Sequence, residues 1–380
     1  MSTKLNYRSI VFILIFVLIT SQACTPKTPI KVGVIAELTG KQSELGINLR
    51  NGIQLAAEEI NSSGGINGRP IELVIKDDLG TPQGAQDAEN YVIDQNVVAI
   101  IGHLTSNQTV EGFKIASQRG VLLLSGTAST SLLSGKKDLF FRTEPSNEYF
   151  AEVFSEYIHD VKGVTRIAII YDLDNDTYSI PMVNSFTQKL TSLNGTVSET
   201  VSFSGSKTTN FDILIQKLIK SKAEGVFIIA SPLNTATIAQ LIRLQGSDLQ
   251  LFAAPWAQGL DLLNNGGDAI EGLELINAYD INDSSPALQE IKAKYKERYA
   301  EEPVFTAMMG YELMNVLSKA LQENDGKAEG LSEGFLRIKT FDGLEGKIYM
   351  DEYGDSSRTL HIIKVENHQF KSIETISPIE

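Results

Sequence analysis

Cysteine and histidine are scarce in this sequence. Cys24 is the only cysteine among 380 residues, so no disulfide can form within the chain. The four histidines do not combine with cysteine or aspartate at the spacing of metal ligands. The sequence also lacks a Gly-x-Ser-x-Gly nucleophile elbow and a phosphate-binding Gly-x-x-x-x-Gly-Lys loop. We therefore expect neither an enzyme nor a bound metal or other cofactor, and we expect a structural role for His103.

Positive charge is also in short supply. The chain has 33 lysine and arginine residues against 47 aspartate and glutamate residues, a net charge of −14. Without Lys4 and Arg8, which lie in a separate N-terminal segment, 31 basic residues remain and the net charge is −16. A surface with this charge disfavours nucleic acids and anionic lipid surfaces as partners.

Only one long apolar run is present, and it lies at the N-terminus. Lys4 and Arg8 precede ten apolar residues, Ile10 to Ile19, and small or polar residues follow up to Ala23. This order of a basic, an apolar and a small-residue segment is typical of a signal peptide, and ten apolar residues are too few to span a bilayer as a helix. We predict that residues 1–23 are removed on export.

Cys24 directly follows the predicted cleavage site, where a bacterial lipoprotein has its lipidated cysteine. Ala23 fits the residue before such a cysteine, whereas Ser21 and Gln22 depart from the usual leucine and small residue. An ordinary signal peptide that happens to end at a cysteine is the alternative. We predict that Cys24 carries diacylglycerol, that residues 24–30 form a lipidated tether, and that this lipid is the only attachment to the membrane.

The rest of the chain is long enough for two domains and alternates β-rich apolar runs with helical patterns. This alternation predicts βαβ units and a mainly parallel sheet, which is an α/β fold. In the first half, Ile53, Ala57 and Ile60 recur at helical spacing, and Gly64-Gly65 ends that helix. The strands predicted here are 31–37, 71–77, 98–102 and 121–125, and the helices are 45–62, 82–95 and 106–119.

A second series after residue 145 repeats the first. Its predicted strands are 166–171, 196–203, 225–230 and 250–254, and its helices are 146–160, 181–193, 211–223 and 233–245. Helices at 286–299 and 306–321, a glycine-punctuated stretch at 341–354 and a last strand at 360–365 follow. Two such series predict two doubly wound, Rossmann-like lobes.

A set of short motifs occurs in an order that is similar to a known family. The motifs are Lys31–Gly40 (KVGVIAELTG), Gly52 with Ile60-Asn61 and Gly64–Gly68 (GGING), Asp77-Asp78 with Pro82, Ile101–Ser106 (IGHLTS), Arg142-Thr143, Arg166–Asp172 (RIAIIYD), Asn210-Phe211 and Gly343–Gly346 (GLEG). Over about residues 31–365 the sequence resembles the type I periplasmic binding proteins of branched-chain amino acid transport, the Leu/Ile/Val-binding family.

The resemblance implies two lobes joined by a three-stranded hinge, with crossings that we place near Ser146, Asn277 and Lys347. The N-terminal lobe would then comprise residues 31–145 and 278–346, and the C-terminal lobe residues 146–277 and 347–380. A ligand is expected between the lobes, at the carboxyl ends of the strands, and a hinge motion is expected to close the lobes around it.

Ser106 is the first candidate for ligand contact. It follows an apolar strand and opens a predicted helix, so its backbone N–H, its hydroxyl and the helix dipole converge on a point that suits a carboxylate. The alternative is that Thr105 or Ser106 only caps the helix. The resemblance implies that Ser106 binds the ligand carboxylate.

A loop of small residues, 125–129, follows the next strand, where backbone and hydroxyl groups can approach a ligand closely. On its own this is an ordinary polar loop. The resemblance implies that Thr127 and Ser129 contact the α-amino and α-carboxylate groups of a ligand. In the second lobe the resemblance implies that Tyr178 closes over the ligand, whereas a half-buried surface tyrosine is the alternative.

Trp256 departs from the family pattern, because leucine-binding relatives have a glutamate for the ligand's ammonium group after this proline. A core tryptophan is the alternative, and a cleft tryptophan would offer an aromatic face to an apolar group or a cation. Ser231 stands where those relatives have an aromatic residue, and Asn234 is a nearby hydrogen-bonding candidate. Glu37, after the first strand, could supply the missing negative charge or be an exposed loop residue.

These features predict an extracytoplasmic substrate-binding lipoprotein of an ATP-binding-cassette importer that captures an amino acid or related small carboxylate. The permease and ATPase subunits of the importer are partners implied by the resemblance. The alternative is a ligand-sensing protein for an amide, urea-like or aromatic solute. Such a sensor would act through a separate partner, because no second apolar span follows the lobes.

Overall fold

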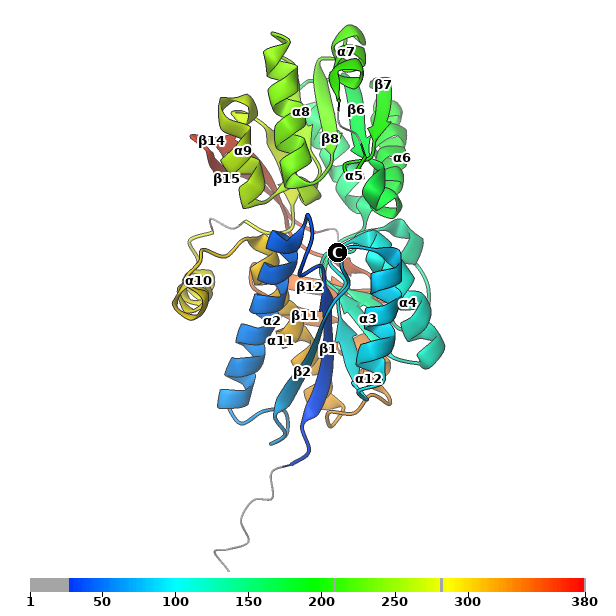
Figure 1. Cartoon of the computed structure of the whole chain (residues 1–380), viewed down its shortest axis with the longest axis vertical. Coiled ribbons are helices and arrows are strands. Elements are labelled where there is room, and N and C mark those ends of the chain that lie inside the picture. Colours follow the sequence, from blue (N-terminus) through cyan, green and yellow to red (C-terminus); the bar gives the residue numbers. More distant parts are fainter. Residues whose placement is uncertain (1–26, 208–209, 281–282, 379–380) are drawn as a thin grey trace, which may run out of the picture.

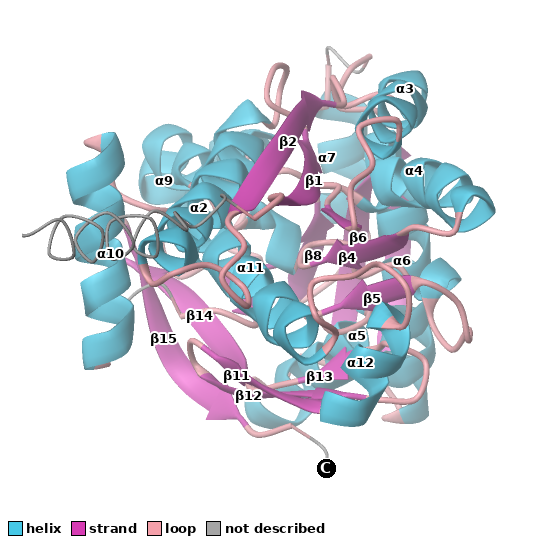
Figure 2. Ribbon diagram, turned by 90° about the horizontal axis from the view of Figure 1, so that it is seen from below, coloured by secondary structure: helices cyan, strands magenta, loops and turns pink. Residues whose placement is uncertain are grey.

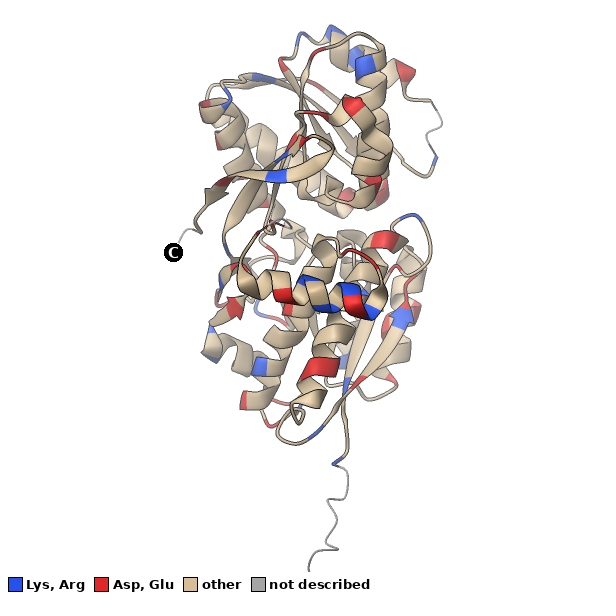
Figure 3. Ribbon diagram, turned by 90° about the vertical axis from the view of Figure 1, so that its left-hand side faces the viewer, with Lys and Arg blue, Asp and Glu red and all other residues tan. Residues whose placement is uncertain are grey.

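Parallel strands form the centre of each of two lobes in the computed structural model, which describes residues 27–207, 210–280 and 283–378 (Figure 1). The predicted signal peptide and the lipidation site Cys24 lie outside these residues. Among the described residues, no helix is long and apolar enough to cross a membrane. Aspartate and glutamate residues occur along the ribbon of both lobes (Figure 3), in keeping with the net charge of −14.

The first lobe contains a five-stranded parallel sheet with the order β2-β1-β3-β4-β5. Its strands are β1 (Ile30–Ala36), β2 (Ile71–Asp77), β3 (Ala99–Ile101), β4 (Leu122–Ser125) and β5 (Phe140–Arg142). Its helices are α2 (Ser43–Ser62), α3 (Pro82–Ile93), α4 (Ser106–Arg119), α10 (Pro286–Tyr299), α11 (Phe305–Glu323) and α12 (Leu331–Ile338). Figure 2 shows α3 and α4 on one side of the sheet and α2 and α11 on the other.

The alternation of side chains along β1 explains this layering. Val32 and Val34 belong to the apolar cluster that includes α2 and α11, whereas Ile35 belongs to the cluster that includes α3 and α4. Successive residues of a strand point to opposite faces of a sheet, so a continuous apolar run is buried on both faces only when helices cover both. The β-rich apolar runs of the sequence therefore become the central strands.

The second lobe has a seven-stranded sheet with the order β15-β14-β10-β9-β8-β6-β7. Its strands are β6 (Arg166–Asp172), β7 (Thr196–Phe203), β8 (Gly225–Ile229), β9 (Gln250–Ala253), β10 (Glu274–Asn277), β14 (Leu360–Glu366) and β15 (Gln369–Ile376). Its helices are α5 (Asn147–Glu156), α6 (Asp176–Ser192), α7 (Asp212–Lys220), α8 (Pro232–Leu244) and α9 (Leu260–Gly266). Strands β6 to β10 repeat the order of the first sheet, while β14 and β15 pair antiparallel. The predicted α/β fold with two doubly wound lobes is confirmed.

A third, small antiparallel sheet packs beside the first lobe and contains β11 (Thr340–Gly343), β12 (Gly346–Met350) and β13 (Ser356–Ser357). The backbone N–H of Arg142 in β5 donates to the Gly354 carbonyl at 3.0 Å, which ties this segment to the first lobe. The chain therefore passes to the second sheet between Ser357 and Leu360, whereas the resemblance led us to place this crossing near Lys347. The position of this crossing is set by the pairing of β12 with both β11 and β13, and not by a local sequence pattern.

The segment around Tyr178 also differs from the prediction. The sequence placed Tyr178 in the loop before the predicted helix 181–193. In the structure α6 begins at Asp176 and includes Pro181, so Tyr178 lies in its first turn. Helix α9 and strands β10 and β15 were not predicted as elements, since each is short or lacks a clear period.

Candidate functional site

A cavity lies between the two lobes, at the carboxyl ends of their strands. The first lobe contributes residues after β1, β3, β4 and β5 and from the start of α11, and the second lobe contributes residues after β6 and β9. The lining residues are Gln42, Leu45, Leu104, Thr105, Thr127, Ser129, Glu144, Phe305, Thr306 and Met309 from the first group and Asn175, Tyr178, Pro255 and Trp256 from the second.

The N-terminus of α4 approaches this cavity. Thr105 is the N-cap of the helix and lines the cavity, and Ser106 is the first helical residue beside it. Both side chains are buried, and neither hydroxyl has a hydrogen-bond partner among the described residues. Because Thr105 makes no side-chain cap, capping does not account for these hydroxyls. They can donate to an anionic group, which the positive end of the helix dipole also favours.

The loop after β4 lies beside this helix end. Thr127 and Ser129 both line the cavity. The Thr127 hydroxyl donates to the His103 carbonyl at 3.0 Å, and the Ser129 carbonyl accepts the Asn147 N–H at 2.5 Å. The Ser125 hydroxyl accepts the Ala128 N–H at 3.1 Å, which holds the turn. The loop is thus fixed by the backbone of the first lobe and by the start of α5.

The second lobe contributes aromatic side chains. Tyr178, in the first turn of α6, is buried, and this burial raises the pKa of its hydroxyl. Its ring meets that of Trp256 edge-on, with ring centroids 5.7 Å apart. Trp256 lies in a short 3-10 helix (Pro255–Ala257) after β9, and its indole N–H donates to the Gln42 side chain of the first lobe at 2.7 Å. The tryptophan is therefore a cleft residue that also bridges the lobes.

Besides Ser106, three residues expected at the site lie outside this lining. Ser231 caps α8, accepting the Asn234 N–H at 3.4 Å, and the Asn234 side chain donates to Asp172 at 3.0 Å. The Glu37 carboxylate is buried beneath the turn after β1 and accepts the Gln42 N–H at 2.9 Å. Burial raises the pKa of Glu37 despite this hydrogen bond. The structure thus brings together Thr127, Ser129, Tyr178 and Trp256, with Ser106 next to them.

Several lining residues were missed by sequence reasoning. Phe305, Thr306 and Met309 come from the start of α11, about 200 residues from Thr105 in the sequence, so no local pattern could reveal them. Glu144 could have been predicted as a lining residue. Its carboxylate lies in Arg142-Thr-Glu-Pro145, just after β5, at the edge of the sheet where the other candidates lie. Burial raises the pKa of Glu144 to about 8, while the charges of Arg358 and Arg142 oppose the rise.

Comparison with known proteins identifies the same family that the sequence motifs resemble. Residues 29–369 match the family described as periplasmic binding protein. A leucine-, isoleucine-, valine-, threonine- and alanine-binding protein of Pseudomonas aeruginosa is 25% identical over 330 residues, which cover 86% of this chain and 87% of that protein.

Solved structures share the fold closely. A leucine-binding protein from Thermotoga maritima has a TM-score of 0.85 at 27% identity and covers 92% of this chain and 99% of its own. A solute-binding protein of an ABC transporter from R. palustris, solved in complex with benzoate, has a TM-score of 0.82 at 16% identity over 92% and 97% of the two chains, which shows the shared fold alone. The chain therefore belongs to the type I periplasmic binding proteins of the branched-chain amino acid group, a family of extracytoplasmic solute-binding proteins of ATP-binding-cassette transporters and not of enzymes.

Proposed function

We propose that this protein is the substrate-binding lipoprotein of an ATP-binding-cassette importer and that it captures an amino acid or related small carboxylate. The observation that carries the proposal is the pair of buried, unpartnered hydroxyls of Thr105 and Ser106 at the N-terminus of α4, beside a cavity between two lobes. The Pseudomonas aeruginosa relative, whose name states that it binds five amino acids, supports the same solute class.

The carboxylate of the solute would accept hydrogen bonds from Ser106, Ser129 and neighbouring hydroxyls. Its apolar part would lie against Leu104, Phe305 and Met309, and Tyr178 and Trp256 would cover it from the second lobe. A buried charge needs hydrogen bonds, whereas an apolar group needs only to leave water. A pocket with hydroxyls on one side and apolar and aromatic side chains elsewhere therefore suits a small amphiphilic acid.

The proposal includes export and anchoring. Residues 1–23 would be removed, Cys24 would carry the lipid, and residues 24–30 would tether the lobes to the membrane near the permease and ATPase subunits. Mass spectrometry of the mature N-terminal peptide tests this step. A lipid-modified Cys24 is expected, and an unmodified mature cysteine would contradict the anchor.

Thermal unfolding with a panel of amino acids and organic acids tests the solute class. A solute that binds only the native state stabilises it by about 2.7 kcal/mol at a hundredfold excess over Kd, so the midpoint of unfolding should rise with one or more panel members. Ser106→Ala and Ser129→Ala should each weaken binding by about 10-fold to 100-fold, because each removes a hydrogen bond to a charged group.

Ser117→Ala is a matched control, since Ser117 is exposed on the same helix, α4. It should bind the solute like the unchanged protein. Unchanged affinity in both Ser106→Ala and Ser129→Ala would mean that the carboxylate site lies elsewhere. No rise in the unfolding midpoint with any panel member would rule out an amino acid or small carboxylate as the solute.

A further inference from the structure

Glu144 presents an unpaired carboxylate to the cavity. It follows β5 on the first connection between the lobes and is 4% exposed. Its Oε2 atom is buried without a hydrogen-bond partner, and no ion pair among the described residues includes Glu144. A buried carboxyl group without a partner is costly, so its persistence in the wall of a binding cavity needs an explanation.

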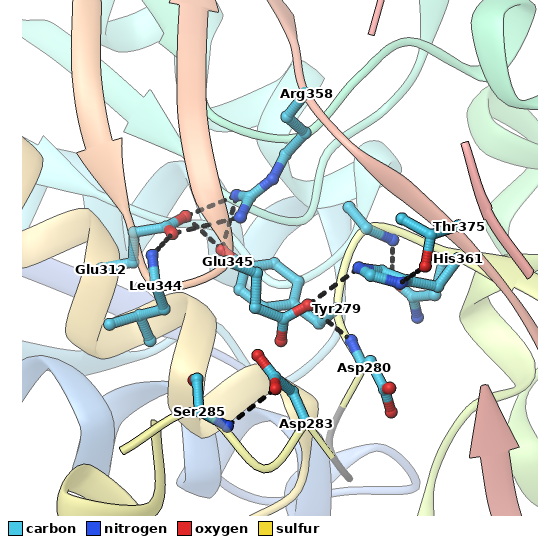
Figure 4. Close-up of polar contacts among 12 residues, drawn as sticks. Tyr279, Asp280, Asp283, Ser285, Glu312, Leu344, Glu345, Arg358, His361 and Thr375 are labelled. Atoms are coloured by element: carbon cyan, nitrogen blue, oxygen red, sulfur yellow. Dashed lines mark hydrogen bonds and ion pairs between the residues drawn. The ribbon is translucent and has the colours of Figure 1, made fainter. Parts of the chain in front are cut away.

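The nearest cations do not neutralise Glu144, because other acids already hold them. Arg358, on the third connection between the lobes, pairs with both oxygens of Glu312 at 2.5 and 3.2 Å and donates to the Tyr279 hydroxyl at 2.8 Å (Figure 4). Tyr279 lies on the second connection and its hydroxyl also contacts Glu312. The Leu344 N–H donates to Glu312 at 2.7 Å. One buried cation is thus matched by one buried anion.

The charge of Arg142 is also paired with another acid. Its guanidinium group forms an ion pair with Asp355 at 2.7 Å and donates to the carbonyls of Ala128 and Thr130 at 3.3 and 3.1 Å. The Arg142–Asp355 and Arg358–Glu312 pairs are each neutral. An ionised Glu144 would therefore leave one negative charge uncompensated beside the cavity.

We infer that Glu144 binds an ammonium group of the solute, which makes amine-bearing acids, and not simple carboxylic acids, the preferred substrates. This inference rests on the proposed function and specifies its solute. An ammonium ion supplies the missing positive charge and up to three N–H donors to the unpaired oxygens. A simple aromatic or aliphatic acid would leave Glu144 unpaired.

Binding of an amine is then coupled to a proton. Burial favours the neutral carboxyl of Glu144, the negative charge of Glu312 adds to this, and Arg358 and Arg142 act in the opposite direction, with a resulting pKa of about 8. The other titratable groups near Glu144 are the hydroxyls of Tyr178 and Tyr279, whose pKa values burial raises. At pH 7 the Glu144 proton must leave for solvent when the ammonium group arrives.

Calorimetry on the full-length mature protein tests the inference. The probes are the twenty common L-amino acids, the analogue of the tightest binder with hydrogen in place of the amino group, and benzoate. The unchanged protein should prefer the amino acid over its desamino analogue by at least about 100-fold, the loss typical of breaking a buried charge pair. Glu144→Gln, which keeps the shape of the side chain, should abolish this preference and leave the desamino analogue bound as before or more tightly.

Proton release provides a second readout. Titrations at pH 7 in two buffers of different ionisation enthalpy should show proton release with the unchanged protein and none with Glu144→Gln. Glu274→Gln is the control, because Glu274 is equally buried but pairs with Lys162 and Tyr157 away from the cavity. It should keep both the preference and the proton release.

The outcomes separate the two proposals. Glu144→Gln with full affinity and full preference for the amino acid overturns the inference. Binding of benzoate or the desamino acid as tightly as any amino acid overturns the inference but leaves a carboxylate-binding function in place. Binding of no probe overturns both.

Discussion

His103 shows how a single buried side chain supports the site. It follows β3 and lies between Asp78 and Glu89, with its ring nitrogens 2.7 and 3.0 Å from their carboxylates, and all three side chains are inaccessible to solvent. Burial alone would lower the pKa of His103. The two carboxylates outweigh burial and raise the pKa to about 9. Because the His103 carbonyl also accepts the Thr127 hydroxyl, this charged triad supports the loop that lines the cavity.

The raised pKa predicts a pH dependence of stability. The folded protein holds the His103 proton more tightly than the unfolded chain, in which histidine titrates near 6.5. The stabilisation is therefore complete below about pH 6.5 and is lost as the pH rises through about 9. Urea unfolding should show a decrease of roughly 3 kcal/mol across this window, since one pKa unit corresponds to about 1.4 kcal/mol.

His103→Gln should lose that part of the pH dependence and be less stable at pH 6. His368→Gln is the control for the substitution itself, because His368 is half exposed on the β14–β15 turn. Equal pH dependence in His103→Gln and the unchanged protein would show that His103 is not charged in the folded state.

The packing of α2 against α11 sets one wall of the cavity. Gly52 and Gly310 lie where the helices cross: a Cβ atom at Gly52 would be 1.9 Å from the Ala307 carbonyl oxygen, and one at Gly310 would be 2.1 Å from that of Leu49. The Thr306 hydroxyl donates to the Leu45 carbonyl at 2.9 Å. This close approach places the first turn of α11 at the cavity.

Gly310→Ala should separate the two helices, because backbone atoms cannot yield as a flexible side chain could. We expect a loss of about 1–3 kcal/mol in the free energy of unfolding, the usual cost of overpacking, together with weaker solute binding. Denaturant unfolding and calorimetry measure the two effects.

Gly334→Ala is the matched control. It also lies in a helix, α12, but its Cβ atom would meet other atoms only at ordinary contact distances of 3.7 Å and more. This variant should be as stable as the unchanged protein or slightly more so, since alanine favours a helix. Equal stability of both variants would show that the helices can adjust to a methyl group.

The two lobes touch beyond the cavity through α4 and the start of α6. The Asn107 N–H donates to the Asn175 side chain at 3.1 Å, the Asn107 amide group donates to the Asp174 carbonyl at 3.2 Å, and the Thr177 N–H donates to Asn107 at 3.0 Å. Lys41 of the first lobe also donates to the Gly205 carbonyl at 2.9 Å. These contacts join the two lobes, so we expect them to favour a closed form over an open one.

Asn107→Ala should shift the protein toward an open form. The alanine keeps the backbone N–H and removes the side-chain hydrogen bonds, those to the Asp174 carbonyl and from the N–H and hydroxyl of Thr177. Their loss is worth about 1–2 kcal/mol, so we expect solute affinity to fall about 10-fold, mainly through faster dissociation. Stopped-flow binding measures the rates, and small-angle scattering without solute should show a larger radius of gyration.

Asn90→Ala is its control. The Asn90 side chain donates to the Gln86 carbonyl one turn earlier in α3, within one lobe. Closure and affinity should not change in this variant. A scattering profile and a dissociation rate that Asn107→Ala leaves unchanged would show that these contacts do not hold the lobes together.

The order of the elements was predictable because it depends on local patterns. Apolar runs and helical spacing identified β1 to β4 and α2 to α4 to within two residues at each end, because each such element buries a face whose apolar residues recur at a regular spacing in the sequence. The strand ends that precede Ser106, Thr127 and Ser129 were found for the same reason. Their ligand contacts remain predictions.

The remaining features depend on contacts between distant segments. The third connection between the lobes lies at Arg358 because β12 pairs with β13, and the start of α11 faces the cavity because two glycines allow α2 and α11 to approach. The charge of Glu144 is not neutralised because Arg358 and Arg142 pair with Glu312 and Asp355. These two acids lie in α11 and just before β13, far from Glu144 in the sequence. Local patterns in a chain specify which faces are apolar, but charge pairing and cavity walls arise only when separate segments pack together.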